Sequence, residues 1–141
     1  MLKFLSRLFF IGFLLNFVWE ITQMIFYSPV GMGSLDNYFY FLKIHWFASL
    51  GDAAMIITGY LIITLVAQNR FWFKKYNNYW ILFLLLLPTW QALIEYNALH
   101  KGLWAYAPSM PLIFGIGVLP LFQMLILPGA ALFLSRKYFK D

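Results

Sequence analysis

The sequence predicts an all-α integral membrane protein, built as a bundle of four membrane-spanning helices. The chain has 141 residues, of which 63% are hydrophobic and only 11% are charged. A soluble domain has about a quarter charged residues, because water must wet its surface. Four apolar segments each approach the roughly 20 residues that cross a bilayer core, where only helices and closed barrels satisfy the backbone. We therefore expect one transmembrane domain over residues 1–141.

The first two spans are expected at residues 8–27 and 43–66. Lys3 and Arg7 precede the first span, as basic residues precede the apolar run of a signal peptide. The run continues through Trp19 and shows no small-residue cleavage site, so we interpret it as a retained helix.

The last two spans are expected at residues 78–99 and 111–135. Pro88 lies inside the third span, where it is expected to kink the helix. The stretch "PSMPLIFGIGVLP", residues 108–120, predicts an irregular proline- and glycine-rich start to the fourth span, followed by a regular helix from Pro120.

The lysine and arginine residues predict the orientation of the bundle. Only Lys43 and Lys101 fall on one side of the four spans. The other basic residues fall on the opposite side: Lys3, Arg7, Arg70, Lys74, Lys75, Arg136, Lys137 and Lys140. Under the positive-inside rule, both termini are cytoplasmic, and the outer segments are 28–42, which contains Asp36, and 100–110. Aromatic residues near the span ends are typical of interfacial belts: Trp46, Trp72, Trp80, Trp104, Tyr76, Tyr79 and Tyr106.

Composition excludes several function classes. The chain has no cysteine, which excludes disulfides, thiolate nucleophiles and cysteine-based zinc sites. The formal charge is +5, but the basic residues stand at the ends of apolar runs and form no stripe, so no nucleic-acid partner is predicted.

Three acidic residues, Glu20, Asp52 and Glu95, lie inside predicted spans. An ionised carboxylate at mid-membrane costs about 2.5–3.5 kcal/mol on insertion scales. These carboxyls must therefore be protonated, paired, or turned toward a shared cavity.

Helical spacing indicates where the polar residues point. Each predicted helix has one polar stripe, and such stripes can meet only inside a bundle. The stripes are Asn16, Glu20 and Gln23; His45, Ser49 and Asp52, with Tyr60 further along; Gln91 and Glu95; and Gln123. We expect one buried pocket in the outer half of the bilayer, formed by Glu20, His45, Asp52 and Glu95, with the amides as its supporting shell.

Structural explanations stand beside this one. Asparagine, glutamine and serine often join membrane helices by hydrogen bonds worth about 0.6 kcal/mol each. His45 beside Trp46 also fits an interfacial position, and Lys43 or Lys101 could pair with the carboxyls.

The expected pocket has the equipment for acid–base catalysis. A protonated acid, an ionised acid and an imidazole can transfer protons, with Glu20 and Asp52 as acid and base and with Glu95 and His45 tuning or relaying. Aromatic walls stabilise carbocations, so isomerisation or cyclisation of an isoprenoid-like lipid would use both features. The walls are Trp19, Trp90, Trp104, Tyr60 and Tyr106. The predicted substrate-binding residues are Asn16, Trp19, Gln23, Tyr60, Gln91, Trp104, Tyr106 and Gln123.

Other chemistries fit the residues less well. Glu95 and His100 in "EYNALH" are spaced i+5 rather than the i+3 of bundle di-iron motifs, and H-E-x-x-H is absent. Ser34 in "GMGSL" does not fit a G-x-S-x-G nucleophile motif. We predict neither a metal nor another cofactor.

A non-enzymatic alternative is a binding or coupling protein. Its buried acids would carry protons, or hold a cationic ligand or metal, within a membrane complex. On either hypothesis the expected partners are membrane lipids and a hydrophobic small molecule, and a homodimer would complete a pocket that four helices leave open.

Residues 95–127, "EYNALHKGLWAYAPSMPLIFGIGVLPLFQMLIL", resemble the repeat of the small membrane-bound lycopene cyclases of carotenoid synthesis. That repeat pairs an intramembrane acid with a following aromatic G-x-W-x-Y/F turn and a proline-led helix that carries carboxylates. The matching residues are Glu95, Gly102, Trp104, Tyr106 and Pro120. Phe122 and Gln123 stand where that family has acids.

The motifs "NFVWEITQMIFY", "HWFASLGD" and "WAYAPSMP" also resemble a group of small four-span bacterial inner-membrane proteins. This resemblance implies a multi-pass protein of the bacterial inner membrane and supplies no activity. It marks recurring polar and aromatic positions at Glu20, Gln23, His45, Asp52, Trp104 and Tyr106.

Overall fold

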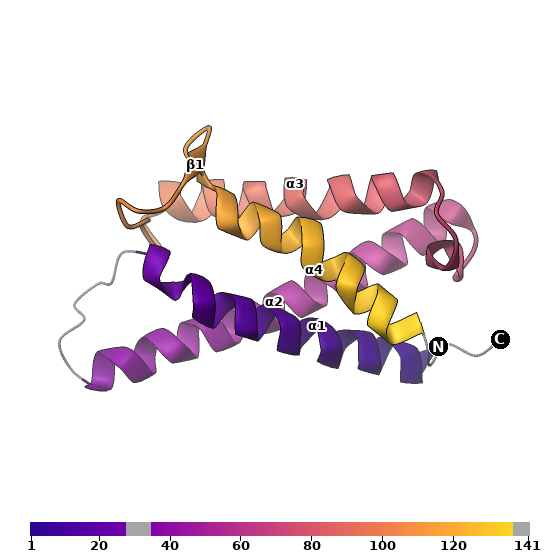
Figure 1. The fold of residues 1–141 in the computed structure, drawn as a ribbon, viewed down its shortest axis with the longest axis horizontal. Helices are drawn as coiled ribbons and strands as arrows, with labels where there is room; N and C mark the ends of the chain where they lie inside the picture. Colours follow the sequence, from indigo (N-terminus) through magenta and orange to yellow (C-terminus); the bar gives the residue numbers. More distant parts are fainter. Residues whose placement is uncertain (28–34, 137–141) are drawn as a thin grey trace.

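The computed structural model describes residues 1–27 and 35–136, with the side chains of residues 35–38 left aside. Its long elements are α1 (Leu2–Gln23), α2 (Leu35–Ala67), α3 (Asn78–His100) and α4 (Val118–Arg136). Two 3₁₀ turns, η1 (Met24–Phe26) and η2 (Trp72–Lys74), and two short strands, β1 (Leu112–Ile113) and β2 (Ile116–Gly117), lie between them. The protein is therefore mostly helical (Figure 1).

Each long helix is long and apolar enough to cross a membrane. The segments with this property are Leu2–Phe26, Phe39–Ala67, Asn78–His100 and Val118–Arg136. Large apolar side chains stand exposed along them, for example Val18, Leu65, Leu85 and Leu93. Exposed side chains of this kind suit contact with lipid tails, so the structure is compatible with the predicted multi-pass membrane protein.

The four helices pack in a ring, in which α1 contacts α2 and α4, and α3 contacts α2 and α4. The chain reverses after each helix, so Leu2 and Arg136 lie at the same end of the bundle (Figure 1). This end also holds the connection from α2 to α3. We call it the basic end, after its exposed cations Lys3, Arg7, Arg70, Lys74, Lys75 and Arg136. The opposite end, with β1 and β2, is the hairpin end.

The basic half of the bundle has an aromatic core. Phe4 of α1 stacks on Phe73 with ring centroids 5.5 Å apart, and it meets Tyr60 at 5.2 Å. Trp72 is only 1% exposed and packs on Phe83 at 5.3 Å, so it belongs to this core rather than to an interfacial belt. The loop from α2 to α3 is thus anchored in the bundle by its own aromatic side chains.

The first two helices begin earlier in the chain than the predicted spans, whereas the third agrees with its prediction. α1 begins earlier than predicted, at Leu2. α2 begins at Leu35, so Asp36 lies in a helix and not in a loop. α3 closely matches the prediction and continues through Pro88.

The predicted fourth span starts later than expected, because residues 111–117 form a hairpin. Phe114 and Gly115 have φ angles of 50° and 79°, and two central residues with positive φ make the tight turn that fits strand twist. Leu112 pairs with Gly117, and the Val118 N–H donates to the Pro111 carbonyl at 2.9 Å. The irregular start predicted from prolines and glycines is therefore a hairpin, and α4 begins at Val118, with Pro120 in its first turn.

Candidate functional site

Polar side chains from all four helices are buried in the interior of the bundle. Glu20 and Asp52 are each 7% exposed, His45 is 5% and Glu95 is 2%. The amides predicted to surround them are buried as well: Asn16, Gln23, Gln91 and Gln123. The polar stripes thus face inward, as the helical spacing predicted, and apolar side chains face outward.

Glu20 of α1 pairs with His45 of α2. Its Oε2 lies 2.7 Å from His45 Nδ1, which joins the two helices by a buried ion pair when the imidazole is protonated. Its Oε1 accepts a hydrogen bond of 2.8 Å from Gln23, one turn further along α1. Lys43 and Lys101 are exposed, so the partner of Glu20 is the imidazole rather than either predicted lysine.

Gln123 connects three helices through one amide group. Its Nε2 donates to Asn16 Oδ1 of α1 and to Asp52 Oδ2 of α2, both at 2.8 Å. Its Oε1 accepts from Gln23 Nε2 at 3.1 Å. Asp52 and Glu20 therefore belong to a single hydrogen-bond network, which runs through Gln123 and Gln23.

The outer part of this network has an aromatic boundary. The Trp19 indole donates to Gln23 Oε1 at 3.0 Å, so the amide is fixed at both of its ends. Asn16 Nδ2 donates to the Gly12 carbonyl at 2.8 Å in its own helix, which leaves Oδ1 for Gln123. We call these connected residues the α1–α2–α4 network: Asn16, Trp19, Glu20, Gln23, His45, Asp52 and Gln123.

Glu95 of α3 is held by the segment that follows its helix. Its Oε2 accepts from the Tyr106 hydroxyl at 2.5 Å and from the Trp104 indole at 3.1 Å. Its Oε1 accepts from Gln91 at 3.2 Å. We call these four residues the Glu95 group.

The turn after α3 explains how these aromatic residues reach back to Glu95. Gly102 has a φ of 65°, which glycine adopts without strain at a helix end. The Leu103 N–H donates to the Ala98 carbonyl at 2.9 Å, and the Gly102 N–H donates to Leu99 at 3.0 Å. These two bonds form a Schellman motif, which reverses the chain and places Trp104 beside its own helix.

Tyr27 lies between the α1–α2–α4 network and the Glu95 group. Its ring centroid is 6.2 Å from that of His45 and 5.5 Å from that of Tyr106. Burial, reinforced by the charges of Glu95 and Glu20, raises the pKa of the Tyr27 hydroxyl far above its ordinary range. Burial and the bond to Glu95 raise the pKa of Tyr106 in the same way, so both hydroxyls stay protonated.

Tyr27 is the link between the two groups of residues, because its ring lies beside both His45 and Tyr106. We call the three buried carboxyls, with His45, the acid cluster; Glu20 and Asp52 are joined through Gln23 and Gln123, and Tyr27 lies between them and Glu95. The sequence analysis missed Tyr27, although it closes the apolar run "MIFY" at the end of the first predicted span.

Two side-chain atoms of the α1–α2–α4 network and the Glu95 group are buried without a hydrogen-bond partner among the described residues, Gln91 Oε1 and His45 Nε2, and the imidazole nitrogen is the one that can exchange a proton. His45 Nε2 is buried and neither donates nor accepts a hydrogen bond within residues 1–27 and 35–136, whereas Nδ1 of the same ring is paired with Glu20. The ring is flanked by Phe41, with centroids 4.7 Å apart. A buried polar atom without a partner is uncommon and calls for an explanation such as a catalytic role.

Tyr60, which was predicted for the site, lies away from the cluster, as does His100. Tyr60 is in the aromatic core of the basic half, where its hydroxyl donates to the Arg70 carbonyl at 2.9 Å. It shares a helix face with Asp52, but two turns of helix separate them along the axis. His100 is exposed and stacks on Tyr96 at 6.1 Å, so it is not part of the site.

A groove runs along α3 and the turn that follows it, and it shares one residue with the Glu95 group. It has a volume of about 370 Å³. Trp90, Leu93, Ile94, Asn97, Ala98, Lys101, Leu103 and Trp104 line it. Trp104 is thus shared between the groove and the hydrogen bonds of Glu95.

The side chains of the cluster do not form a metal site in the part of the chain that the structure describes. There, no three histidine, aspartate or glutamate side chains are grouped so that they could hold a metal ion. Comparison of the chain with protein-family models, curated proteins and solved structures gave no match.

Proposed function

We propose that the protein is an intramembrane acid–base enzyme, of the isomerase or cyclase kind, that acts on a hydrophobic isoprenoid-like or lipid substrate. One observation carries this proposal: His45 is buried, Glu20 binds its Nδ1, and its Nε2 has no partner within the described residues. An imidazole held by a carboxylate through one nitrogen is oriented to exchange a proton through the other.

This geometry favours a division of roles that differs from the prediction. His45 is the group that exchanges a proton with the substrate, and Glu20 is the positioning residue that orients the ring and stabilises the imidazolium. Asp52 and Glu95 are buried carboxyl groups near the reacting centre. Gln123 and the Tyr106 hydroxyl hold these two carboxyls in place.

The proposed isomerisation needs no co-reactant. The imidazolium donates its Nε2 proton to one carbon of a carbon–carbon double bond, which leaves a carbocation on the neighbouring carbon. Loss of a different proton from the next carbon to Nε2 then forms a shifted double bond and restores the imidazolium. The Glu20 carboxylate and the aromatic rings of Tyr27 and Phe41, which lie beside the imidazole, would stabilise the positive intermediate.

Two features support a hydrophobic substrate. The groove on α3 is lined mostly by apolar side chains and includes Trp104, whose indole donates to Glu95. The resemblance of residues 95–127 to the lycopene cyclase repeat supports an isoprenoid in particular. Gln123 stands where those cyclases have an acid, and here its amide joins three helices.

The orientation and location are part of the proposal. Six described cations lie at the basic end, whereas Lys43 and Lys101 are the only two on the other side. This distribution supports cytoplasmic termini, and the resemblance to small four-span bacterial proteins supports insertion in an inner membrane. The cluster would then lie between the middle and the outer surface of the bilayer.

A proton-exchange assay tests the activity. The protein in lipid nanodiscs is incubated with lycopene or squalene in deuterated buffer, and mass spectrometry follows deuterium in the recovered hydrocarbon. We expect incorporation by the wild type and a loss of about 100-fold or more in Glu20→Gln and His45→Gln, since general acid–base groups contribute about that much. Thr58→Ala, on an exposed face of α2, is the matched control with unchanged activity.

A non-enzymatic role in proton coupling or ligand binding is the second candidate. It is favoured by the hydrogen bonds to every intramembrane carboxyl, from Gln23, Gln123 and Tyr106 among others. Folded wild type that incorporates no deuterium into either hydrocarbon would favour this second candidate. Equal incorporation by wild type and Glu20→Gln would reject the assigned roles.

A further inference from the structure

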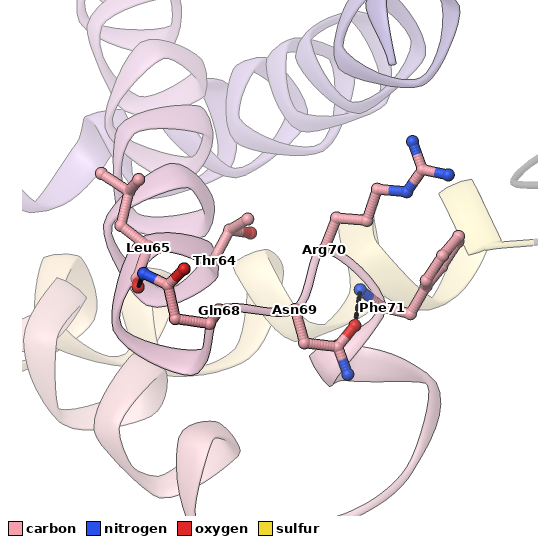
Figure 2. Close-up of a pocket in the computed structure, with 6 residues that line it drawn as sticks. All are labelled: Thr64, Leu65, Gln68, Asn69, Arg70 and Phe71. Atoms are coloured by element: carbon pink, nitrogen blue, oxygen red, sulfur yellow. Dashed lines mark hydrogen bonds between the residues drawn. The ribbon is translucent and has the colours of Figure 1, made fainter.

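The basic end of the bundle carries a groove that the proposed activity does not use. The groove has a volume of about 460 Å³ and lies where α2 passes into the following loop. Its lining residues, Thr64, Leu65, Gln68, Asn69, Arg70 and Phe71, are shown in Figure 2. Thr64 and Leu65 form the helix side, and Arg70 and Phe71 form the loop side.

Hydrogen bonds fix the shape of this groove. Gln68 has a φ of 49°, and its side chain turns back to donate to the Leu65 carbonyl at 2.7 Å. Asn69 Oδ1 accepts from the Phe71 N–H at 2.8 Å (Figure 2). The Arg70 carbonyl accepts from the buried Tyr60 hydroxyl, so the loop is attached to the core.

Among the described residues, the charged side chains beside the groove are cations. The Arg70 guanidinium lies 4.8 Å from the centre of the Phe71 ring, and Lys74 Nζ lies 4.4 Å from the same centre. The acidic residues within the described ranges lie elsewhere: Glu20 and Glu95 in the hairpin half, Asp52 near the middle of α2, and Asp36 in its first turn. The groove is therefore complementary to an anion.

The depth of the groove matches that of a lipid headgroup. The segment of α2 that is long and apolar enough to cross a membrane ends at Ala67, so Thr64 and Leu65 lie just inside this apolar segment and Gln68 to Phe71 lie just beyond it. Leu65 is 69% exposed and gives the inner part an apolar surface. Acyl chains would meet Leu65 while phosphate oxygens meet Arg70, whose planar guanidinium binds phosphate through two parallel hydrogen bonds.

We propose that this groove binds an anionic phospholipid, with the headgroup phosphate at Arg70 and Lys74 and an acyl chain along Leu65. The site is distinct from the acid cluster and does not depend on the proposed enzymatic activity. It would bind lipid of the leaflet that faces the basic end.

Native mass spectrometry of the detergent-purified protein tests this site. The probes are phosphatidylglycerol and phosphatidylcholine with the same acyl chains. We expect the wild type to prefer phosphatidylglycerol and Arg70→Gln to weaken its binding by about fivefold, since a juxtamembrane cation contributes about that factor. Arg70→Gln/Lys74→Gln should abolish the preference. Arg70→Lys, which keeps the charge without the planar fork, should give an intermediate affinity.

Lys101→Gln, at the other end of the bundle, is the control and should leave the preference unchanged. Equal binding of the two lipids by the wild type would overturn the proposal, as would unchanged preference in a folded Arg70→Gln/Lys74→Gln protein. Displacement of phosphatidylglycerol by an equal concentration of inorganic phosphate would assign the site to free phosphate instead.

Discussion

At the residue scale, the acid cluster depends on amide groups that satisfy several partners at once. Gln123 uses both hydrogens of its Nε2 and its Oε1, on Asn16, Asp52 and Gln23. An amide can do this without adding a charge to a site that already contains three carboxyls. The buried amides are therefore part of what makes Glu20 and Asp52 compatible with an apolar bundle.

We predict that Gln123→Leu destabilises the protein by about 1–3 kcal/mol, the usual cost of leaving buried polar partners unsatisfied. The leucine has a similar volume, so the loss would come from Asn16 Oδ1 and Asp52 Oδ2, which no longer receive hydrogen bonds. Unfolding by added denaturing detergent, followed by circular dichroism, measures the change.

Phe122→Leu is the matched control, because Phe122 is the preceding residue and is 47% exposed on the lipid-facing side. It should leave the midpoint close to that of the wild type. If Gln123→Leu unfolds no earlier than Phe122→Leu, the amide contributes no net stability and the network is held by packing alone.

At the element scale, the sequence predicted which face of each helix is polar but not the depth of every residue. Glu20, Gln23, His45 and Asp52 follow from helical spacing, because a polar stripe must turn inward in lipid. The same rule also assigned Tyr60 to the site, although it lies two turns further along α2. Helical spacing shows which face a residue is on, but not how far along the helix axis it lies from the other residues of that face. Trp72 was misplaced for a related reason: closeness to a span end does not show whether a side chain folds back into the core.

The hairpin could not be predicted from the same signals. Prolines and glycines in residues 108–120 indicated an irregular segment, but the turn at Phe114 and Gly115 depends on a positive φ at a phenylalanine, which composition does not reveal. This element has a structural consequence for the site. A Cβ on Gly117 of β2 would lie 3.0 Å from Tyr106 Cζ, so the strand packs directly against the ring that binds Glu95.

We predict that Gly117→Ala displaces the Tyr106 ring and weakens its hydrogen bond to Glu95. A contact of 3.0 Å is tighter than most real Cβ contacts, so the ring, and Met110 Sδ at 3.2 Å, would have to give way by a few tenths of an ångström. Deuterium incorporation in the proposed assay should fall in Gly117→Ala. It should fall by a similar factor in Tyr106→Phe, because both changes act on the hydrogen bond from Tyr106 to Glu95.

Gly51→Ala is the control for this change, because a Cβ there meets nothing within 4 Å. Alanine also favours helix over glycine, so this variant should be at least as stable as the wild type. Full activity in Gly117→Ala together with reduced activity in Tyr106→Phe would show that the strand does not position the ring.

At the scale of the whole molecule, charge and chemistry separate along the bundle axis. The aromatic core and the exposed cations occupy one end, and the acid cluster lies toward the other. No single helix shows this separation of the cations from the acid cluster, because each helix is apolar along most of its length. It arises from the alternating direction of four helices, which brings Lys3, Arg70 and Arg136 together at one end.

The absence of cysteine from the chain makes the proposed orientation directly measurable. We predict that Ser109→Cys, near the hairpin end, reacts with a membrane-impermeant maleimide in intact cells, because the acid cluster would face the outer half of the bilayer. Tyr76→Cys, at the basic end and 97% exposed in the wild type, should react only after the membrane is permeabilised. The reverse pattern would place the basic end outside, against the charge rule, and would move the acid cluster toward the cytoplasmic leaflet.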